Sequence, residues 1–135
     1  MFKRILLAID GAAQSPRIIA SAAELARCSD AVVHVVCAVD RAFAMPRQDA
    51  LEYPPAEQEQ HEAQALVDDA VVQLQPCVAT GAVVAGDPAR AILREAERLE
   101  CDLIVIGHRH LGRIERLLDP SAVSYTHLTL PTSDL

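Results

Sequence analysis

Four short apolar segments, spread along the whole chain, constrain the fold more than any other feature of the sequence. They span Phe2–Ile9, Val32–Val39, Cys77–Ala85 and Leu103–Ile106. Each has the length of a β-strand, and none alternates cleanly between apolar and polar residues. A strand that is apolar on both faces must be covered on both faces, which is typical of a parallel sheet between helices. The sequence therefore predicts a buried parallel sheet.

Helical patterns fill the stretches between these segments. Apolar residues recur at helical spacing over residues 18–26, 63–74 and 89–99. Ser15-Pro16 and Asp87-Pro88 introduce the first and third stretches, and a capping side chain followed by proline is typical of a helix start. The apolar face of the second stretch comprises Ala63, Leu66, Val67, Ala70, Val71 and Leu74. Alternating strands and helices predict an α/β fold with right-handed crossovers.

The segment Asp40–Pro55 interrupts this alternation. It contains three prolines, Pro46, Pro54 and Pro55, and shows no apolar periodicity. Few apolar side chains are available to anchor it, so we expect a mobile loop between the second strand and the second helix.

Length and charge narrow the class of protein. The chain has 135 residues, which favours a single domain, and its net charge is −7. An acidic chain with only 3% aromatic residues is a poor match for duplex or single-stranded nucleic acid. No apolar run is long enough to span a bilayer, and the start of the chain lacks the pattern of a signal peptide. We expect a cytoplasmic protein with neither nucleic acid nor membrane as a partner.

The four cysteines form no C-x-x-C pair. In a reducing cytosol, Cys28, Cys37, Cys77 and Cys101 are most simply buried small hydrophobes, with a redox or metal role as the alternative.

Polar and glycine residues follow two of the predicted strands. Asp10-Gly11 follows the first, and Gly107 followed by His108-Arg109-His110 ends the fourth. Ligands of an open parallel sheet bind beyond the carboxyl ends of its strands, where the strand order reverses. Gly107 allows a backbone to approach a ligand closely, although glycine at such a place is also an ordinary turn residue. These strand ends are the candidate binding site.

Five pieces of the chain, in this order, resemble the universal stress protein family. They are residues 3–11, 20–26, 34–40, 86–93 and 101–107. The resemblance runs from Met1 to about Val123. It implies a five-stranded parallel sheet of order 3-2-1-4-5 flanked by helices, and a homodimer in which the fifth strand is the sheet edge that pairs between protomers.

ATP-binding members of this family carry a glycine-rich phosphate motif that this chain keeps only in part. Gly107 and Ser121 match it, whereas His110 and Pro120 stand where the motif has its second and third glycines. Proline has no N–H to donate to a phosphate oxygen. Asp119 adds a carboxylate that is unfavourable beside a polyphosphate. Asp119-Pro120 is instead a good start for a fourth helix.

The resemblance implies that the residue at Asp10 and the backbone near Ala38 lie by the nucleoside. The expected degraded ATP site therefore comprises Asp10, Ala38, Gly107, Arg109, His110 and Ser121.

The sequence gives less support for a metal site or a catalytic site. His108 and His110 with a nearby carboxylate form an incomplete metal set, because no further Cys or His stands at metal-site spacing. The same stretch is most simply a solvated basic loop. Ser15 and Ser121 have no partner that the sequence places beside them, so we assign no catalytic residue and no metal ligand.

The last residues differ from the rest of the chain. Residues 124–135 lack the periodicity that precedes them and resemble translated sequencing-adapter sequence. We therefore expect a domain over residues 1–123, a non-native tail over residues 124–135, and no fifth strand. Without that strand, the chain would be less stable than a complete family member and would dimerise poorly.

These observations favour a cytoplasmic stress-response protein that regulates through dimerisation and partner contacts, without catalysis. Nucleotide binding would be weak or absent, and no cofactor is expected, although ATP is the candidate ligand. The alternative is an ATP-binding universal stress protein that acts as a nucleotide-dependent switch or slow ATPase.

Overall fold

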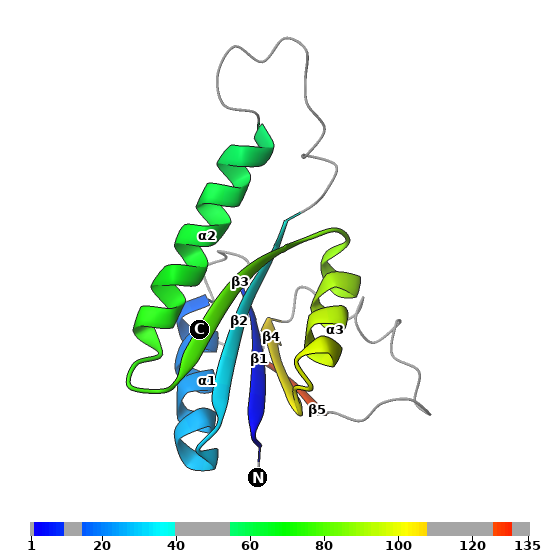
Figure 1. The fold of residues 1–135 in the computed structure, drawn as a ribbon. Helices are drawn as coiled ribbons and strands as arrows, with labels where there is room; N and C mark the ends of the chain where they lie inside the picture. The colour runs from blue at the N-terminus through cyan, green and yellow to red at the C-terminus, as the bar shows by residue number, and fades with distance from the viewer. Residues whose placement is uncertain (1, 10–14, 40–54, 108–125, 131–135) are drawn as a thin grey trace.

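The computed structural model describes residues 2–9, 15–39, 55–107 and 126–130. Strands and helices alternate through most of this part of the chain (Figure 1). In chain order the elements are β1 (Arg4–Ile9), α1 (Ser15–Ser29), β2 (Val32–Val39), α2 (Pro55–Gln73), β3 (Ala79–Ala85), α3 (Pro88–Arg98), β4 (Leu103–Gly107) and β5 (Thr126–Leu130). The α/β architecture predicted from the apolar segments is confirmed.

The strands form one parallel sheet of order β3-β2-β1-β4-β5. The chain starts in the middle of the sheet with β1, moves outward to β2 and β3, and then crosses back to β4 on the other side of β1 (Figure 1). This is the order that the family resemblance implies.

The expectation that the fifth strand is missing is wrong. Thr126–Leu130 pairs in parallel with β4, from Leu103 opposite Thr126 to Gly107 opposite Leu130. Side-chain composition argues against a strand here, because residues 126–130 contain no continuous apolar run. Strand pairing is made by the backbone, and it satisfies N–H and C=O groups of β4 that would otherwise lie on an open edge. Pro131 follows the strand directly, at a position where a further ladder hydrogen bond would be lost.

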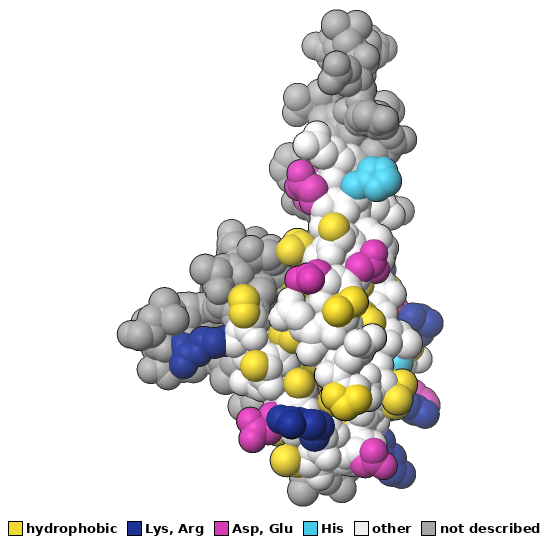
Figure 2. All heavy atoms as spheres, turned by 90° about the vertical axis from the view of Figure 1, so that its left-hand side faces the viewer, with side chains coloured by type: hydrophobic (Ala, Val, Ile, Leu, Met, Phe, Trp, Pro, Cys, Tyr) yellow, Lys and Arg dark blue, Asp and Glu magenta, His cyan; other side chains and the backbone are white. Residues whose placement is uncertain are grey.

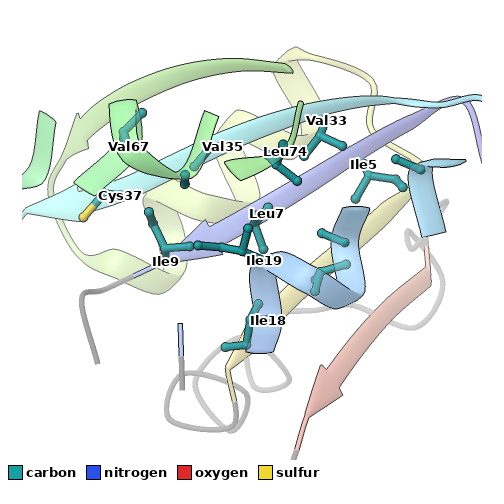
Figure 3. Close-up of a cluster of buried hydrophobic side chains, with 14 of the residues drawn as sticks. Ile5, Leu7, Ile9, Ile18, Ile19, Val33, Val35, Cys37, Val67 and Leu74 are labelled. Carbon is teal, nitrogen blue, oxygen red and sulfur yellow. The ribbon is translucent and has the colours of Figure 1, made fainter. Parts of the chain in front are cut away.

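The two faces of the sheet are covered by different helices. On one face, β1, β2 and β4 pack against α1 and α2, and Figure 3 shows Leu7, Ile19, Val35 and Val67 meeting in this layer. On the other face, Leu6, Ala8, Val36, Ile104 and Ile106 pack against α3. Successive residues of a strand point to opposite faces, so both layers need apolar residues from β1 and β4. The unbroken apolar segments are explained by this arrangement.

The burial predicted for the third apolar segment is wrong. No residue of β3 is buried, and Val78, just before it, is 65% exposed. β3 has the apolar composition of a central strand. It is nevertheless the edge strand of the described sheet and pairs only with β2, so its side chains are less covered. Figure 2 shows the outside of the molecule on the α2 side, where apolar side chains lie singly among charged ones.

Two smaller expectations also need correction. Leu66 is 38% exposed, although Ala63, Val67, Ala70 and Leu74 of the same helix are buried as predicted. Cys28 is exposed and Cys77 half-buried, so only Cys37 and Cys101 are buried small hydrophobes. The loop predicted over Asp40–Pro55 lies outside the described residues, except that Pro55 is the first residue of α2.

Among the described residues, no helix is both long enough and apolar enough to cross a membrane.

Candidate functional site

The carboxyl ends of β1 and β4 lie side by side in the centre of the sheet. Ala8 is opposite Ile106, so β1 ends at Ile9 where β4 ends at Gly107. From β1 the chain continues to β2 on one side, whereas β4 lies on the other. The strand order therefore reverses between β1 and β4, which is where open parallel sheets bind ligands.

Two of the predicted site residues lie at this edge. Gly107 is the last residue of β4, and Ala38 is the last but one of β2. Ile9 pairs with Cys37, so Ala38 stands one residue beyond the end of β1, where the backbone of β2 is no longer covered by that strand. Ala38 is half-buried. Both residues therefore stand at the carboxyl edge, on either side of β1.

The other predicted site residues are Asp10, Arg109, His110 and Ser121, and they lie outside the described residues. The same is true of Pro120 and of the fourth helix expected to start at Asp119. Asp10 follows β1 directly in the sequence.

The connection between β3 and α3 lies at the same carboxyl edge of the sheet, next to the end of β2. Gly86 has a φ of +123°, a conformation that L side chains rarely adopt. Its N–H donates to the carbonyl of Val39, 3.0 Å away, and so ties the connection to the end of β2. Sequence reasoning did not assign this role to Gly86, although a glycine directly before Asp87-Pro88 was a usable signal.

Asp87 caps the helix that follows, as predicted. Its carboxylate accepts from the backbone N–H of Arg90 at 3.2 Å, and Pro88 occupies the first turn. The start of α3 is therefore held by its own cap and by the bond from Gly86 to Val39.

The groups with shifted pKa values in the described part of the chain are His34, Glu95, Arg98 and Cys101. None of them lies at the carboxyl ends of the strands. The described residues also contain no group of three His, Cys, Asp or Glu side chains arranged to hold a metal ion. The described part of the edge therefore offers backbone groups and, at the start of α3, the carboxylate of Asp87 that caps this helix.

Sequence reasoning also missed a polar cluster nearer the amino ends of the strands. His34 Nδ1 lies 2.7 Å from the hydroxyl oxygen of Thr80, and Glu95 and Arg98 of α3 form an ion pair nearby. A single histidine inside an apolar strand was the only signal for it in the sequence.

Solved structures with the same fold come from different organisms. A protein of the universal stress protein family from Burkholderia pseudomallei is 25% identical, with a TM-score of 0.75 and 96% of each chain covered. A universal stress protein from Archaeoglobus fulgidus in complex with dAMP is 20% identical, with a TM-score of 0.69, covering 94% of this chain and 96% of that one. A universal stress protein in complex with cAMP is 22% identical, with a TM-score of 0.65 and 98% of each chain covered.

No curated protein sequence matches this chain. The model of the universal stress protein family, however, matches residues 1–128, which is nearly the whole sequence and extends past Val123. The solved structures described above share the overall fold of this chain. The chain therefore belongs to the universal stress protein family.

Proposed function

We propose that this member of the family is a non-catalytic regulatory protein that holds an adenine nucleotide only weakly and gains little from the β- and γ-phosphates. The observation that carries the proposal is a contrast at one site. Gly107 and Ala38 stand at the carboxyl edge beside β1, while the sequence after Gly107 replaces two motif glycines by His110 and Pro120.

We expect the nucleoside of the ligand to bind at the ends of β2 and β4. β2 extends beyond its last pair with β1, at Cys37, to Ala38 and Val39, and Gly107 at the end of β4 has no side chain to keep a ligand from its backbone. The relatives in complex with cAMP and dAMP carry ligands with one phosphate each, which supports adenine nucleotides as the ligand class.

The phosphate end is where this chain departs from the ATP-binding pattern. A phosphate cradle works through backbone N–H groups that converge on the oxygens. Pro120 has no such group, His110 adds a side chain where the motif has bare backbone, and Asp119 adds a negative charge. Each added phosphate therefore brings repulsion without new hydrogen bonds.

Calorimetric titration with dAMP, cAMP and ATP plus Mg²⁺ tests the proposal. We expect the dissociation constants for ATP and dAMP to agree within about tenfold, which corresponds to ~1.4 kcal/mol. The double variant His110→Gly, Pro120→Gly should favour ATP selectively and leave dAMP unchanged. A low-micromolar dissociation constant for ATP, about −8 kcal/mol, would overturn the proposal.

The alternative, a nucleotide-dependent switch or slow ATPase, predicts a different result at the purification stage. ATP would then accompany the protein isolated from bacteria, and a denatured sample would release it in stoichiometric amount. We expect the protein to come free of ATP.

Regulation without catalysis requires contacts with other chains. We propose a homodimer formed through the outer edge of the sheet at β5, because the strand that the family uses for pairing is present here as Thr126–Leu130. Sedimentation equilibrium of the full chain measures the dimer. Replacing Thr129 by proline removes an N–H from β5 and should shift the protein toward monomer, and a dimer of unchanged strength would contradict this interface.

A further inference from the structure

The outer side of β3 is an open strand edge in the described part of the sheet, where β3 pairs only with β2 (Figure 1). Two hydrogen bonds fix which backbone groups face β2. Val33 N–H donates to the carbonyl of Val78 at 2.9 Å, and Gly86 N–H donates to the carbonyl of Val39 at 3.0 Å. In a parallel ladder, alternate residues of a strand turn both backbone groups toward the same neighbour. Val78, Gly86 and the even-numbered residues between them therefore face β2.

The odd-numbered residues of β3 turn their N–H and C=O groups outward instead. They are Ala79, Gly81, Val83 and Ala85. Such groups need water or another strand as a partner. Edge strands usually carry a charged side chain or a proline that prevents pairing with other chains, and the sequence of β3 contains neither. β3 therefore has the features of a strand to which an extended peptide can be added.

On the α2 face, this edge is bordered by a carboxylate. A Cβ atom at Gly81 would meet Val67 and Val71, so these residues of α2 lie directly over β3. Asp68 follows Val67 and stands one helical turn before Val71, which places it on the flank of α2 nearest the edge. Asp68 is exposed and accepts a hydrogen bond from Nε2 of Gln64 at 2.9 Å. An added strand would lie beside this flank.

On the α3 face, the same edge presents partly uncovered apolar side chains. The even-numbered residues point to this face, because successive residues of a strand point to opposite sides. Val78 is 65% exposed, and Ala82 and Val84 are half-buried. Apolar side chains of an added strand would find partners here.

The chain that forms this edge is acidic. Residues 55–89 contain no Lys or Arg, and their acidic residues are Glu57, Glu59, Glu62, Asp68, Asp69 and Asp87. The basic residues of α3 are Arg90, Arg94 and Arg98, and Arg98 is paired with Glu95. Negative charge along the α2 side opposes the approach of a second copy of the same edge and favours a basic partner.

We propose that the outer edge of β3 binds an extended segment of a partner protein in which basic and apolar residues alternate. The segment adds a strand beside β3, with its basic side chains toward Asp68 and its apolar side chains toward Val78, Ala82 and Val84. This partner contact belongs to the regulatory role proposed above, but it uses neither the nucleotide site nor β5. Its failure would therefore leave the nucleotide titrations and the dimer measurement unaffected.

Fluorescence anisotropy with a labelled, end-blocked peptide of alternating Lys and Val, about eight residues long to match β3, tests the proposal. This peptide should bind the full chain, and binding should weaken as salt is raised. An alternating Glu-Val peptide and a peptide with all Lys before all Val are the controls, and both should bind much more weakly. Equal binding by either control would overturn the proposal.

Methylated peptides test the strand pairing without altering the protein. Successive N–H groups of an extended peptide point to opposite sides, so N-methylation of every Lys or of every Val blocks only one side. One of these two peptides should lose binding and the other should keep it. Equal binding by both would contradict an added strand.

Variants of the chain locate the contact. Ala85→Pro removes an outward N–H while sparing the bonds to β2, and should weaken peptide binding about three- to tenfold. Ala85→Val keeps the N–H and should bind normally. Asp68→Asn should weaken binding about two- to fivefold, whereas Glu24→Gln, at an exposed position of α1, should not. Unchanged binding in both Ala85→Pro and Asp68→Asn, or a peptide that dissociates a dimer of this chain, would overturn the proposal.

Discussion

The two faces of the sheet are packed with different kinds of side chain. Beneath α1 and α2, the described core consists of aliphatic side chains with Cys37, drawn from three strands and two helices. Beneath α3 the described cluster is smaller, and the polar set of His34, Glu95 and Arg98 lies at its margin. The difference shows where this chain can tolerate change. The two-helix face is held by the packing of apolar side chains, whereas the α3 face also carries the ion pair of Glu95 and Arg98.

The largest effect should come from a cavity in the two-helix face. Leu7 is completely buried there, in contact with the layer of α1 (Figure 3). Leu7→Ala should lower the free energy of unfolding by about 2–5 kcal/mol, measured by urea denaturation. Val72→Ala, at a position 62% exposed on α2, is the control and should cost less than about 0.5 kcal/mol. Equal costs at the two positions would mean that this face is not the main core.

A smaller effect on the same face should come from Gly81 of β3. A methyl group added there would overlap Cγ1 of Val67 and crowd Val71, so Gly81 lets α2 approach the edge strand closely. Gly81→Ala should cost about 1–3 kcal/mol through overpacking. The double variant Gly81→Ala, Val67→Ala should lose less stability than the sum of the two single variants, because the second change makes room for the first. Strict additivity would show that α2 does not limit this position.

On the α3 face, the cap at Asp87 should matter next. Asp87→Ala removes the acceptor for the Arg90 N–H and should cost about 1 kcal/mol. Asp87→Ser keeps an acceptor and should restore most of the loss. The same pair of variants separates local from global effects, since amide exchange should increase first in the opening turn of α3. An equal increase in α1 would contradict a role confined to the cap.

The least perturbing comparison uses the cysteines. Cys101 is 3% exposed in the α3-face cluster, and burial raises its pKa to about 11, which keeps the thiol protonated. Cys28 is exposed on α1. Brief alkylation at pH 8 followed by mass spectrometry should modify Cys28 first, and Cys37 and Cys101 only after unfolding. Early labelling of Cys101 would mean that the α3 face opens more readily than its packing indicates.

Much of the fold was predictable because the relevant signals are local. β2 has the predicted bounds, and Asp87-Pro88 starts α3 with the expected cap. Both signals depend on a few neighbouring residues. The candidate site was predictable only in outline, since Gly107 and Ala38 could be placed at strand ends while the rest of the site lies outside the described residues.

Predictions failed where the outcome depended on neighbours distant in the sequence. β3 resembles a central strand in composition, yet it is the sheet edge and none of its residues is buried. Thr126–Leu130 lacks an apolar run, yet it pairs with β4 through backbone groups. Local composition carries no information about which strands have a neighbour on each side. Whether the tail is native sequence stays a prediction.

The sequence by itself determined the α/β class, the four aliphatic strands and the helices that cover them, because hydrophobic periodicity and capping are properties of consecutive residues. Only the tertiary structure decided that β3 lies at an edge, that Gly81 sits under Val67, and that His34 contacts Thr80 within the influence of the Glu95 and Arg98 charges. His34, Thr80 and the pair of Glu95 and Arg98 lie on three different elements, β2, β3 and α3. Their effect on one another depends on distance in space, which the order of residues does not record.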